Sequence, residues 1–460
     1  MNRDTETNKL LFEQMPVPQA VRTLAVPSII AQLIILIYNM ADTFFIGRVN
    51  NPMMVAGSAL ILPIFNVCIA VSTIAGTGGG TLIARLLGCG REKDARSVAA
   101  FSFFFSLCGG LLFAVGTAVF MHPLLLALGA SSETYAFARM YASCVIVVGA
   151  APTILAMTMS NLLRNTGRSK EAGFGVSMGG LINIALDPLF MFVILPRGNE
   201  ILGAGIATAL SNCISCAYFL VTIHRLHSPI LNFSPRGIHI KREDLISFFS
   251  VGLPASLGPL LFDLDYIIIN RLISGYSDVA LAAMGIVLKV ERVPQNVGIG
   301  LCLGMVPLAA YNYSAGNYGR LEHVLRFTRT VGTVIGLCSI TLYEFFAPYV
   351  IRAFIADSAT VALGTGFLRI RAFATLMMFL CFIYVHYFQA VGRGNYALLL
   401  IVLRWLIVNI PMLFILNGLF GMYGVVWCAF VSDSIVAFLS WLVYHRFRRQ
   451  HRAQLESMNR

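Results

Sequence analysis

Long apolar stretches recur along the whole chain and alternate with short polar connections. A helix of about 20 apolar residues crosses a bilayer, and the stretches here are that long or longer. The pattern therefore predicts an all-α membrane protein of about twelve transmembrane helices. The expected helices lie at residues 23–47, 54–84, 97–121, 135–160, 171–195, 201–224, 246–271, 278–312, 324–350, 362–390, 395–417 and 420–445.

The two halves of the chain contain matching turns. Gly90 corresponds to Gly316, and Gly167 corresponds to Gly392 at nearly the same spacing. Each half holds an even number of expected helices, so both halves enter the membrane from the same side. We expect two six-helix lobes related by a pseudo-twofold axis along the membrane normal, with a central cavity between them.

A long polar connection near the middle of the chain separates the expected lobes, and its prolines and charged residues are typical of a linker. The predicted divisions are a cytoplasmic N-terminal segment 1–22, a first lobe 23–224, a cytoplasmic inter-lobe linker 225–245, a second lobe 246–445 and a basic cytoplasmic tail 446–460.

Composition supports a multi-pass membrane protein, because charged residues make up only 12% of the chain and hydrophobic residues 58%. An ordinary soluble domain has about 25% charged residues. The net charge is +12, but Lys and Arg gather in alternate loops and form no basic patch with interleaved aromatic residues. We therefore expect no nucleic-acid partner. The loop pattern predicts a bacterial plasma (inner) membrane protein with both termini cytoplasmic.

Asp42 lies inside the first apolar stretch, where a carboxylate costs roughly 2.5–3.5 kcal/mol on insertion scales. Such a group is expected to protonate, to pair or to bind a cation. The alternative is that Asp42 only bonds a neighbouring helix. Polar residues at matching depth on two other helices favour the functional interpretation.

Those residues are Asn183 and Asp187 on helix 171–195 and Thr208 on helix 201–224. Asn183 and Asp187 are four residues apart, so they share one helix face. Tyr38 precedes Asp42 by one turn on its own helix. At 1.5 Å per residue, Asp42, Asp187 and Thr208 lie ~8, ~14 and ~10 Å from the outer ends of their helices. All three therefore fall in the outer half of the membrane.

The second lobe does not repeat this set, because Asn409 stands opposite Asn183 but no acid follows it. The acids and bases on its first two helices are Asp263, Asp265, Lys289, Glu291 and Arg292. We interpret them as a structural salt-bridge cluster rather than as a transport site, with Arg404 and Asp433 as a similar pair. Candidates for a substrate cavity are Gln32, Asp263 and Asp265.

Several motifs carry a family resemblance: YNMADTFFIG at 38–47, GMVP at 304–307, YNYSA at 311–315, and Arg164 with Gly167. With these motifs the chain resembles the multidrug and toxic compound extrusion (MATE) family, especially its DinF/MepA-like bacterial branch. The resemblance implies a cation-coupled exporter whose ion site consists of Asp42, Asn183, Asp187 and Thr208.

We therefore expect a secondary active multidrug efflux transporter rather than an enzyme. It would exchange amphipathic or cationic compounds for H⁺ or Na⁺ by alternating access, with Tyr38 beside the cation-coupling group. Na⁺ would bind at Asp42, Asn183, Asp187 and Thr208. No cofactor other than the coupling ion and no ATP-binding subunit are expected, and the protein would act as a monomer surrounded by membrane lipid.

Two other functions share parts of this pattern. A flippase of lipid-linked saccharides has the same superfamily architecture, but an anionic pyrophosphate would favour several cavity-facing Arg or Lys residues. Here most basic residues lie in loops, while the first and fifth helices contribute acids. A more distant alternative is an integral membrane enzyme that modifies lipids, which would need a nucleophile or a metal cluster near a membrane face.

Overall fold

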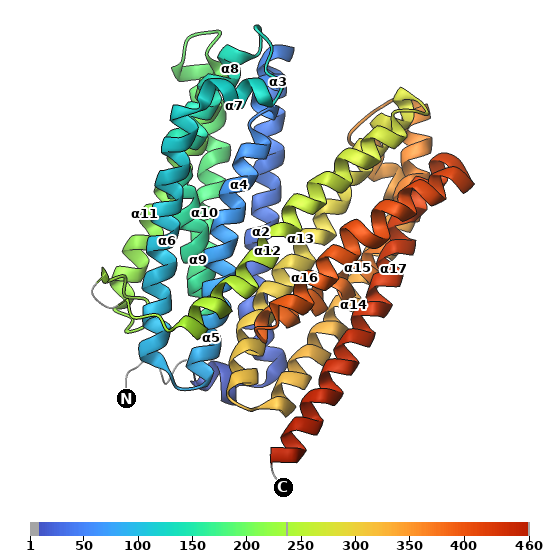
Figure 1. The fold of residues 1–460 in the computed structure, drawn as a ribbon. Helices are drawn as coiled ribbons and strands as arrows, with labels where there is room; N and C mark the ends of the chain where they lie inside the picture. The colour runs from blue at the N-terminus through green and yellow to red at the C-terminus, as the bar shows by residue number, and fades with distance from the viewer. Residues whose placement is uncertain (1–8, 236–237, 459–460) are drawn as a thin grey trace.

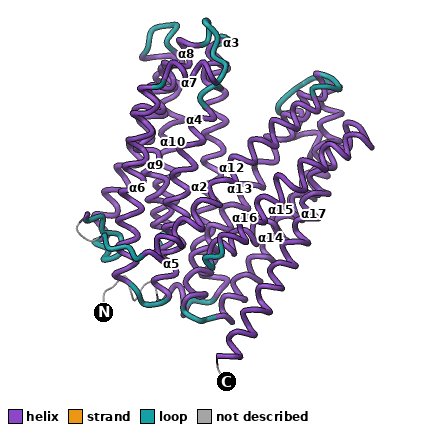
Figure 2. Tube along the Cα trace, in the orientation of Figure 1, coloured by secondary structure: helices purple, strands orange, loops and turns teal. Residues whose placement is uncertain are grey.

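The computed structural model describes residues 9–235 and 238–458, with side chains up to residue 450. Within these ranges the chain consists of helices joined by short loops (Figure 2). Parts of the predicted segments 1–22, 225–245 and 446–460 lie outside the described residues.

The first half of the chain forms six membrane-crossing units, several of which are broken by a π-helical turn (η). In chain order the helices are η1 (Leu10–Gln14), α2 (Val17–Arg48), α3 (Pro52–Ala59), α4 (Leu62–Thr73), η2 (Ile74–Gly79), α5 (Gly80–Gly88), α6 (Glu92–Val119), α7 (Met121–Ala127), α8 (Tyr135–Ala142), η3 (Ser143–Val148), α9 (Ala150–Asn165), α10 (Ser169–Pro188), η4 (Leu189–Ile194) and α11 (Glu200–Leu226).

The second half has longer, less interrupted helices. They are α12 (Arg242–Ile273), α13 (Asp278–Ser314), α14 (Tyr318–Arg352), α15 (Ser358–Ala390), α16 (Gly394–Val402), η6 (Leu403–Asn409) and α17 (Ile410–Met458).

Among the described residues, ten helical stretches are long and apolar enough to cross a membrane, and a pair bent by 48° (Tyr135–Val148 with Ala150–Asn165) makes eleven. The last stretch, Gly394–Gln450, has 57 residues. A straight helix of that length would extend over ~85 Å, more than twice the thickness of a bilayer core. It divides at Gly421, whose φ of 58° and ψ of −141° are not helical. The helical multi-pass fold expected from the sequence is thus confirmed.

The repeat is visible in the backbone. Gly90 and Gly316 have φ of 71° and 74°, and Gly167 and Gly392 have φ of 83° and 76°. Each glycine follows the end of a helix, where the left-handed conformation favours a residue without Cβ. The sequence match between the halves therefore reflects turns of the same shape.

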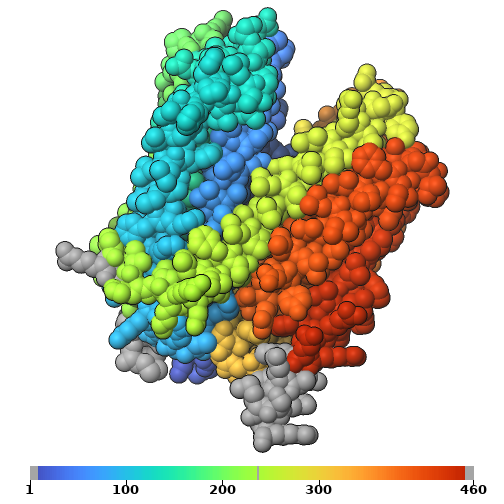
Figure 3. Space-filling model, in the orientation of Figure 1, coloured from blue at the N-terminus to red at the C-terminus, as the bar shows by residue number. Residues whose placement is uncertain are grey.

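The two lobes form a V (Figure 1). They meet at the end where η1 and the last turns of α17 lie, and they diverge at the opposite end. The space-filling view shows an open cleft between the lobes at this wide end (Figure 3). The two-lobe architecture with a central cavity is therefore confirmed.

Glycines allow the lobes to pack closely at the narrow end. A Cβ at Gly304 of α13 would lie 2.4 Å from Cα of Ala25 on α2, and one at Gly78 would lie 2.5 Å from the carbonyl oxygen of Phe248 on α12. Small residues permit such close helix crossings in membranes. The glycine-rich η2 thus packs against the other lobe.

Polar contacts also join the lobes at this end. Arg91 forms ion pairs with Asp94 at 2.7 Å and with Asp244 of α12 at 2.8 Å. Lys241 pairs with Asp94 at 3.1 Å, so these side chains link the first turn of α6 to the start of α12.

The short helix η1 forms a further link. Phe12 is fully buried and stacks on Tyr311 of α13, with ring centroids 4.9 Å apart. Arg320 of α14 donates to the Phe12 carbonyl at 2.7 Å, and the Tyr311 hydroxyl donates to Glu13 at 2.7 Å. Since η1 leads directly into α2, it ties the first helix of one lobe to the other lobe.

Candidate functional site

The polar residues expected to form a cation site come together in the first lobe, on α2, α10 and α11. On α10, Asp187 is 0% exposed and Asn183 is 2% exposed. The Asn183 amide lies 3.4 Å from Asp187 Oδ1 and 3.4 Å from Thr208 Oγ1 on α11. The one-turn spacing of Asn183 and Asp187 therefore lets a single amide bridge two oxygen atoms on neighbouring helices.

Asp42 and Tyr38 face this group from α2. Close packing of α2 on α10 is possible because Gly180 has no side chain: a Cβ there would lie 3.0 Å from the Tyr38 ring. Asp42 is near enough to Asp187 and to Tyr38 for electrostatic interaction with both. All five predicted residues thus belong to one polar group in the first lobe.

Three oxygen atoms of this group are buried and have no hydrogen-bond partner among the described residues. They are Asp42 Oδ1, Asn183 Oδ1 and Asp187 Oδ2. Buried acceptors without partners are uncommon in folded proteins, because each costs about 1–3 kcal/mol. Oxygen atoms from carboxylates and amides suit a hard cation, and a proton on either acid would also convert an acceptor into a donor. The residues present therefore fit a bound H⁺ or Na⁺.

Tyr141 belongs to the same group, although the sequence analysis did not single it out. It is 8% exposed, lies beside Thr208, and interacts electrostatically with Asp42 and Asp187. The sequence contained one signal that could have identified Tyr141, namely its depth along the helix. Tyr141 lies ~9 Å from the start of helix 135–160, close to the depths of Asp42 and Thr208.

The candidates for a substrate cavity do not gather in one place. Gln32 is half-buried on α2, and no described hydrogen bond joins it to the cation-site group. Asp263 on α12 accepts a hydrogen bond from Asn66 on α4, so it lies at the boundary between the lobes. Asp265 points instead into the second lobe, because residues two apart lie on nearly opposite faces of a helix.

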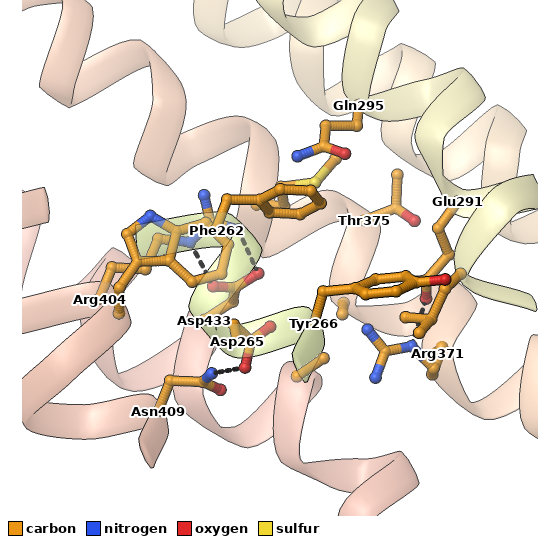
Figure 4. Close-up of a pocket in the computed structure, with 15 residues that line it drawn as sticks. Phe262, Asp265, Tyr266, Glu291, Gln295, Arg371, Thr375, Arg404, Asn409 and Asp433 are labelled. Carbon is orange, nitrogen blue, oxygen red and sulfur yellow. Dashed lines mark hydrogen bonds and ion pairs between the residues drawn. The ribbon is translucent and has the colours of Figure 1, made fainter. Parts of the chain in front are cut away.

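The expected charge cluster in the second lobe has different partners (Figure 4). Among the described residues, neither Asp263 nor Asp265 forms an ion pair with Lys289 or Arg292, so the salt-bridge cluster predicted from these residues is wrong in its pairing. The reason is that these side chains point in different directions around their helix axes. Asp265, for example, accepts a hydrogen bond from Asn409 on η6. Glu291 instead pairs at 2.7 Å with Arg371, a residue on α15 that the sequence analysis missed.

The pair of Arg404 and Asp433 is as expected. Arg404 Nε and Nη2 donate to the two carboxylate oxygens of Asp433 at 2.8 and 3.0 Å. The Arg404 guanidinium also lies over the Trp405 ring, 4.6 Å from its centroid. Within the part of the chain that the structure describes, no three His, Cys, Asp or Glu side chains form a metal-binding group.

Comparison with known proteins places the chain among transporters of one family. The MatE family model matches residues 27–189 and 254–415, one segment in each lobe. The multidrug export protein MepA of Staphylococcus aureus (strain N315) is 29% identical over 438 residues, which cover 95% of both chains. MepA of Staphylococcus saprophyticus subsp. saprophyticus is also 29% identical, with the same coverage.

Solved structures share the fold. A structure of MATE in the straight conformation matches with a TM-score of 0.90 and 22% identity, covering 97% of this chain and 98% of the other. The outward-facing conformation of a multidrug resistance MATE family transporter of the MOP superfamily matches with a TM-score of 0.90, 23% identity and the same coverage. Both matches extend over the two lobes.

Proposed function

The chain belongs to the MatE family, and from this premise we propose that it is a secondary active multidrug efflux transporter. It exports amphipathic, cationic compounds in exchange for H⁺ or Na⁺. Similarity to the MepA multidrug export proteins along nearly the whole chain supports the substrate class. No ATP-binding subunit is part of this proposal, and the transporter acts as a monomer in the lipid bilayer.

The observation that carries the coupling mechanism is a set of three buried oxygens on α2 and α10 for which the described part of the chain offers no hydrogen-bond partner. Two nearby carboxylates share a proton or a cation more easily than they tolerate two bare charges. Asp42 and Asp187 therefore bind the coupling ion, while Asn183, Thr208 and Tyr38 complete its surroundings. Ion binding changes the packing of α2 against α10, and Pro27 inside α2 gives that helix a point at which to bend.

Alternating access follows from the V shape. With both termini in the cytoplasm, the cleft in Figure 3 opens to the outside, and the contacts at the narrow end close the cytoplasmic side. The inward-facing state then requires that η1 leave Tyr311 and Arg320. The ion pairs of Arg91 with Asp244 and of Lys241 with Asp94 must also separate. Binding energy at the cation site must bias this equilibrium, since a ligand shifts populations only through its differential affinity for the two states.

Export is favoured over a flippase of lipid-linked saccharides by the partners of the two buried arginines of the second lobe. Arg371 and Arg404 each pair with an acid, whereas a pyrophosphate would need uncompensated positive charge. A lipid-modifying enzyme is a weaker alternative, because the polar group in the first lobe resembles an ion site more than a nucleophile with its base.

Transport by the purified protein in liposomes tests the proposal. An outward-directed dye flux is expected when an inward gradient of the coupling ion is imposed, and H⁺ and Na⁺ gradients applied separately identify that ion. Absence of dye movement under both gradients, in vesicles that are shown to hold folded protein, would refute antiport. Movement of a lipid-linked saccharide instead would support the flippase.

The proposed orientation can be tested by cysteine labelling in intact cells. In a background where the exposed residues Cys89, Cys108 and Cys338 are replaced by alanine, Glu133→Cys and Gly418→Cys are expected to react with a membrane-impermeant maleimide. Asn232→Cys, on the linker, should react only after permeabilisation. The sequence alone would place this cysteine near Gly237, in the middle of the linker, but Gly237 lies outside the described residues. Labelling of Asn232→Cys in intact cells would reverse the orientation.

A further inference from the structure

We propose that the first lobe binds a small monovalent anion, such as chloride, at Arg164 in the last turn of α9. The ligands of the anion are the Arg164 guanidinium and the hydroxyl group of Ser160, one turn earlier on the same helix. This inference goes beyond the proposed function, since it assigns a ligand of negative charge to a part of the first lobe outside the cation-coupling group.

The first step is the charge of Arg164, whose side chain is only 5% exposed. The other buried arginines of the described residues, Arg371 and Arg404, pair with acids at 2.7 and 2.8 Å. Arg164 forms no ion pair within the described part of the chain. The C-terminal end of α9 compensates its charge only in part, because a helix dipole is equivalent to about half an elementary charge. A buried charge without a counter-ion is strongly destabilising, and a bound anion would remove this penalty.

The second step is the hydrogen-bonding capacity of this helix face. Arg164 Nη1 donates to Asn161 Oδ1 at the long distance of 3.4 Å, while Nε is buried without a partner among the described residues. Ser160 is 1% exposed, and its Oγ also lacks a partner there. Thr153 and Ser102, by contrast, each donate to a carbonyl one turn earlier on their own helix. Residues four apart share a helix face, so the two unused donors of Ser160 and Arg164 lie together.

The third step is how unusual this part of the chain is. Four buried side-chain atoms without a partner among the described residues lie within the ten residues 160–169, and no other ten described residues hold more than two. They are Ser160 Oγ, Arg164 Nε, Asn165 Oδ1 and Ser169 Oγ. Most buried polar atoms in folded proteins have a hydrogen-bond partner, so this concentration points to a ligand.

The fourth step is the size of the ligand. Next to Arg164, Asn161 packs directly beneath η2, where a Cβ at Gly76 would lie 2.9 Å from the Asn161 amide nitrogen. On its other side η2 packs against α12, where a Cβ at Gly252 would lie 2.5 Å from the Ile74 carbonyl oxygen. Close packing and two donors suit a single halide ion. Phosphate or sulfate would need more donors and more room.

Binding of radiolabelled chloride to the purified full-length protein in detergent tests the proposal, with gluconate used to keep the ionic strength constant. We expect saturable binding of one chloride per protein, with competition by bromide and none by sulfate. Arg164→Gln removes the charge and the Nε donor and should lower the affinity about tenfold or more. Ser160→Ala removes one neutral donor and should lower it by about two- to tenfold.

Arg139→Gln is the matched control, because it removes one positive charge from an exposed position on α8 of the same lobe. It should bind chloride as the unmodified protein does. A second measurement needs no variant and therefore does not depend on the folding of Arg164→Gln. Crystals of the unmodified protein grown in bromide are expected to show an anomalous peak within hydrogen-bonding distance of Arg164 Nε.

Absence of saturable chloride binding by the unmodified protein would overturn the proposal. Unchanged affinity in a folded Arg164→Gln protein would do the same, as would a bromide peak that lies away from Arg164. The arginine would then serve only to stabilise the end of α9. Because the assay uses neither a gradient nor a drug, its outcome is independent of efflux: a protein that binds chloride but does not transport would contradict the proposed function alone.

Discussion

Replacing Asp42 or Asp187 with asparagine is expected to abolish gradient-driven efflux while leaving the protein folded. Asparagine keeps the approximate size of aspartate but removes the charge and the site for a proton. Both acids lie in one group whose buried oxygens lack a hydrogen-bond partner within the residues that the structure describes. Loss of either acid therefore removes a charge on which the coupling ion depends. The measurement is dye efflux from proteoliposomes under the gradient that drives the unmodified protein.

The double substitution should be little worse than either single one, since residues that act as a unit are strongly non-additive. Asn183→Ala and Thr208→Ala should impair coupling without eliminating it, because each removes one neutral oxygen. Asp278→Asn, on the exposed first turn of α13, is a control for loss of an acid and should transport normally. Full efflux by a folded Asp42→Asn/Asp187→Asn protein would show that coupling takes place elsewhere.

Gly304→Leu is expected to destabilise the protein severely. A Cβ at this position would lie 2.4 Å from Cα and 2.5 Å from the backbone nitrogen of Ala25. Backbone atoms of α2 cannot move aside as a flexible side chain would, so α2 and α13 must separate at the crossing that joins the lobes. Overpacking a core typically costs about 1–3 kcal/mol, and contact with backbone places this change at or above the upper end.

Thermal unfolding in detergent, followed by size-exclusion chromatography, measures the effect. Gly285→Leu is the matched control, because it makes the same change on the same helix. Apart from the backbone of its own helical turns, no atom of the described residues lies within 4 Å of the new Cβ. It should unfold close to the temperature of the unmodified protein, whereas Gly304→Leu should yield little monodisperse protein and no efflux. Similar unfolding temperatures for the two variants would mean that the lobes do not depend on this crossing.

The hydrophobic pattern by itself determined the helices. Transmembrane segments satisfy their backbone hydrogen bonds internally, so length and apolarity predict them without knowledge of neighbours. The repeat could be predicted from the sequence as well. Gly90 and Gly316 both adopt left-handed turns, and this conformation depends on the local sequence rather than on neighbouring helices. Asn183 and Asp187 could be placed on one face because their spacing is a property of a single helix.

Which helix faces meet was decided only by the tertiary structure. Tyr141 joins Thr208 and the two acids, and Glu291 pairs with Arg371 on α15. Asp263 and Asp265 are directed at different lobes although they are two residues apart. The sequence sets the order and depth of polar residues along each helix. Their partners depend on how each helix is rotated about its axis and on where it crosses its neighbours. Helix packing, such as the contact of Gly304 with Ala25 between the lobes, fixes the rotation and the crossing point.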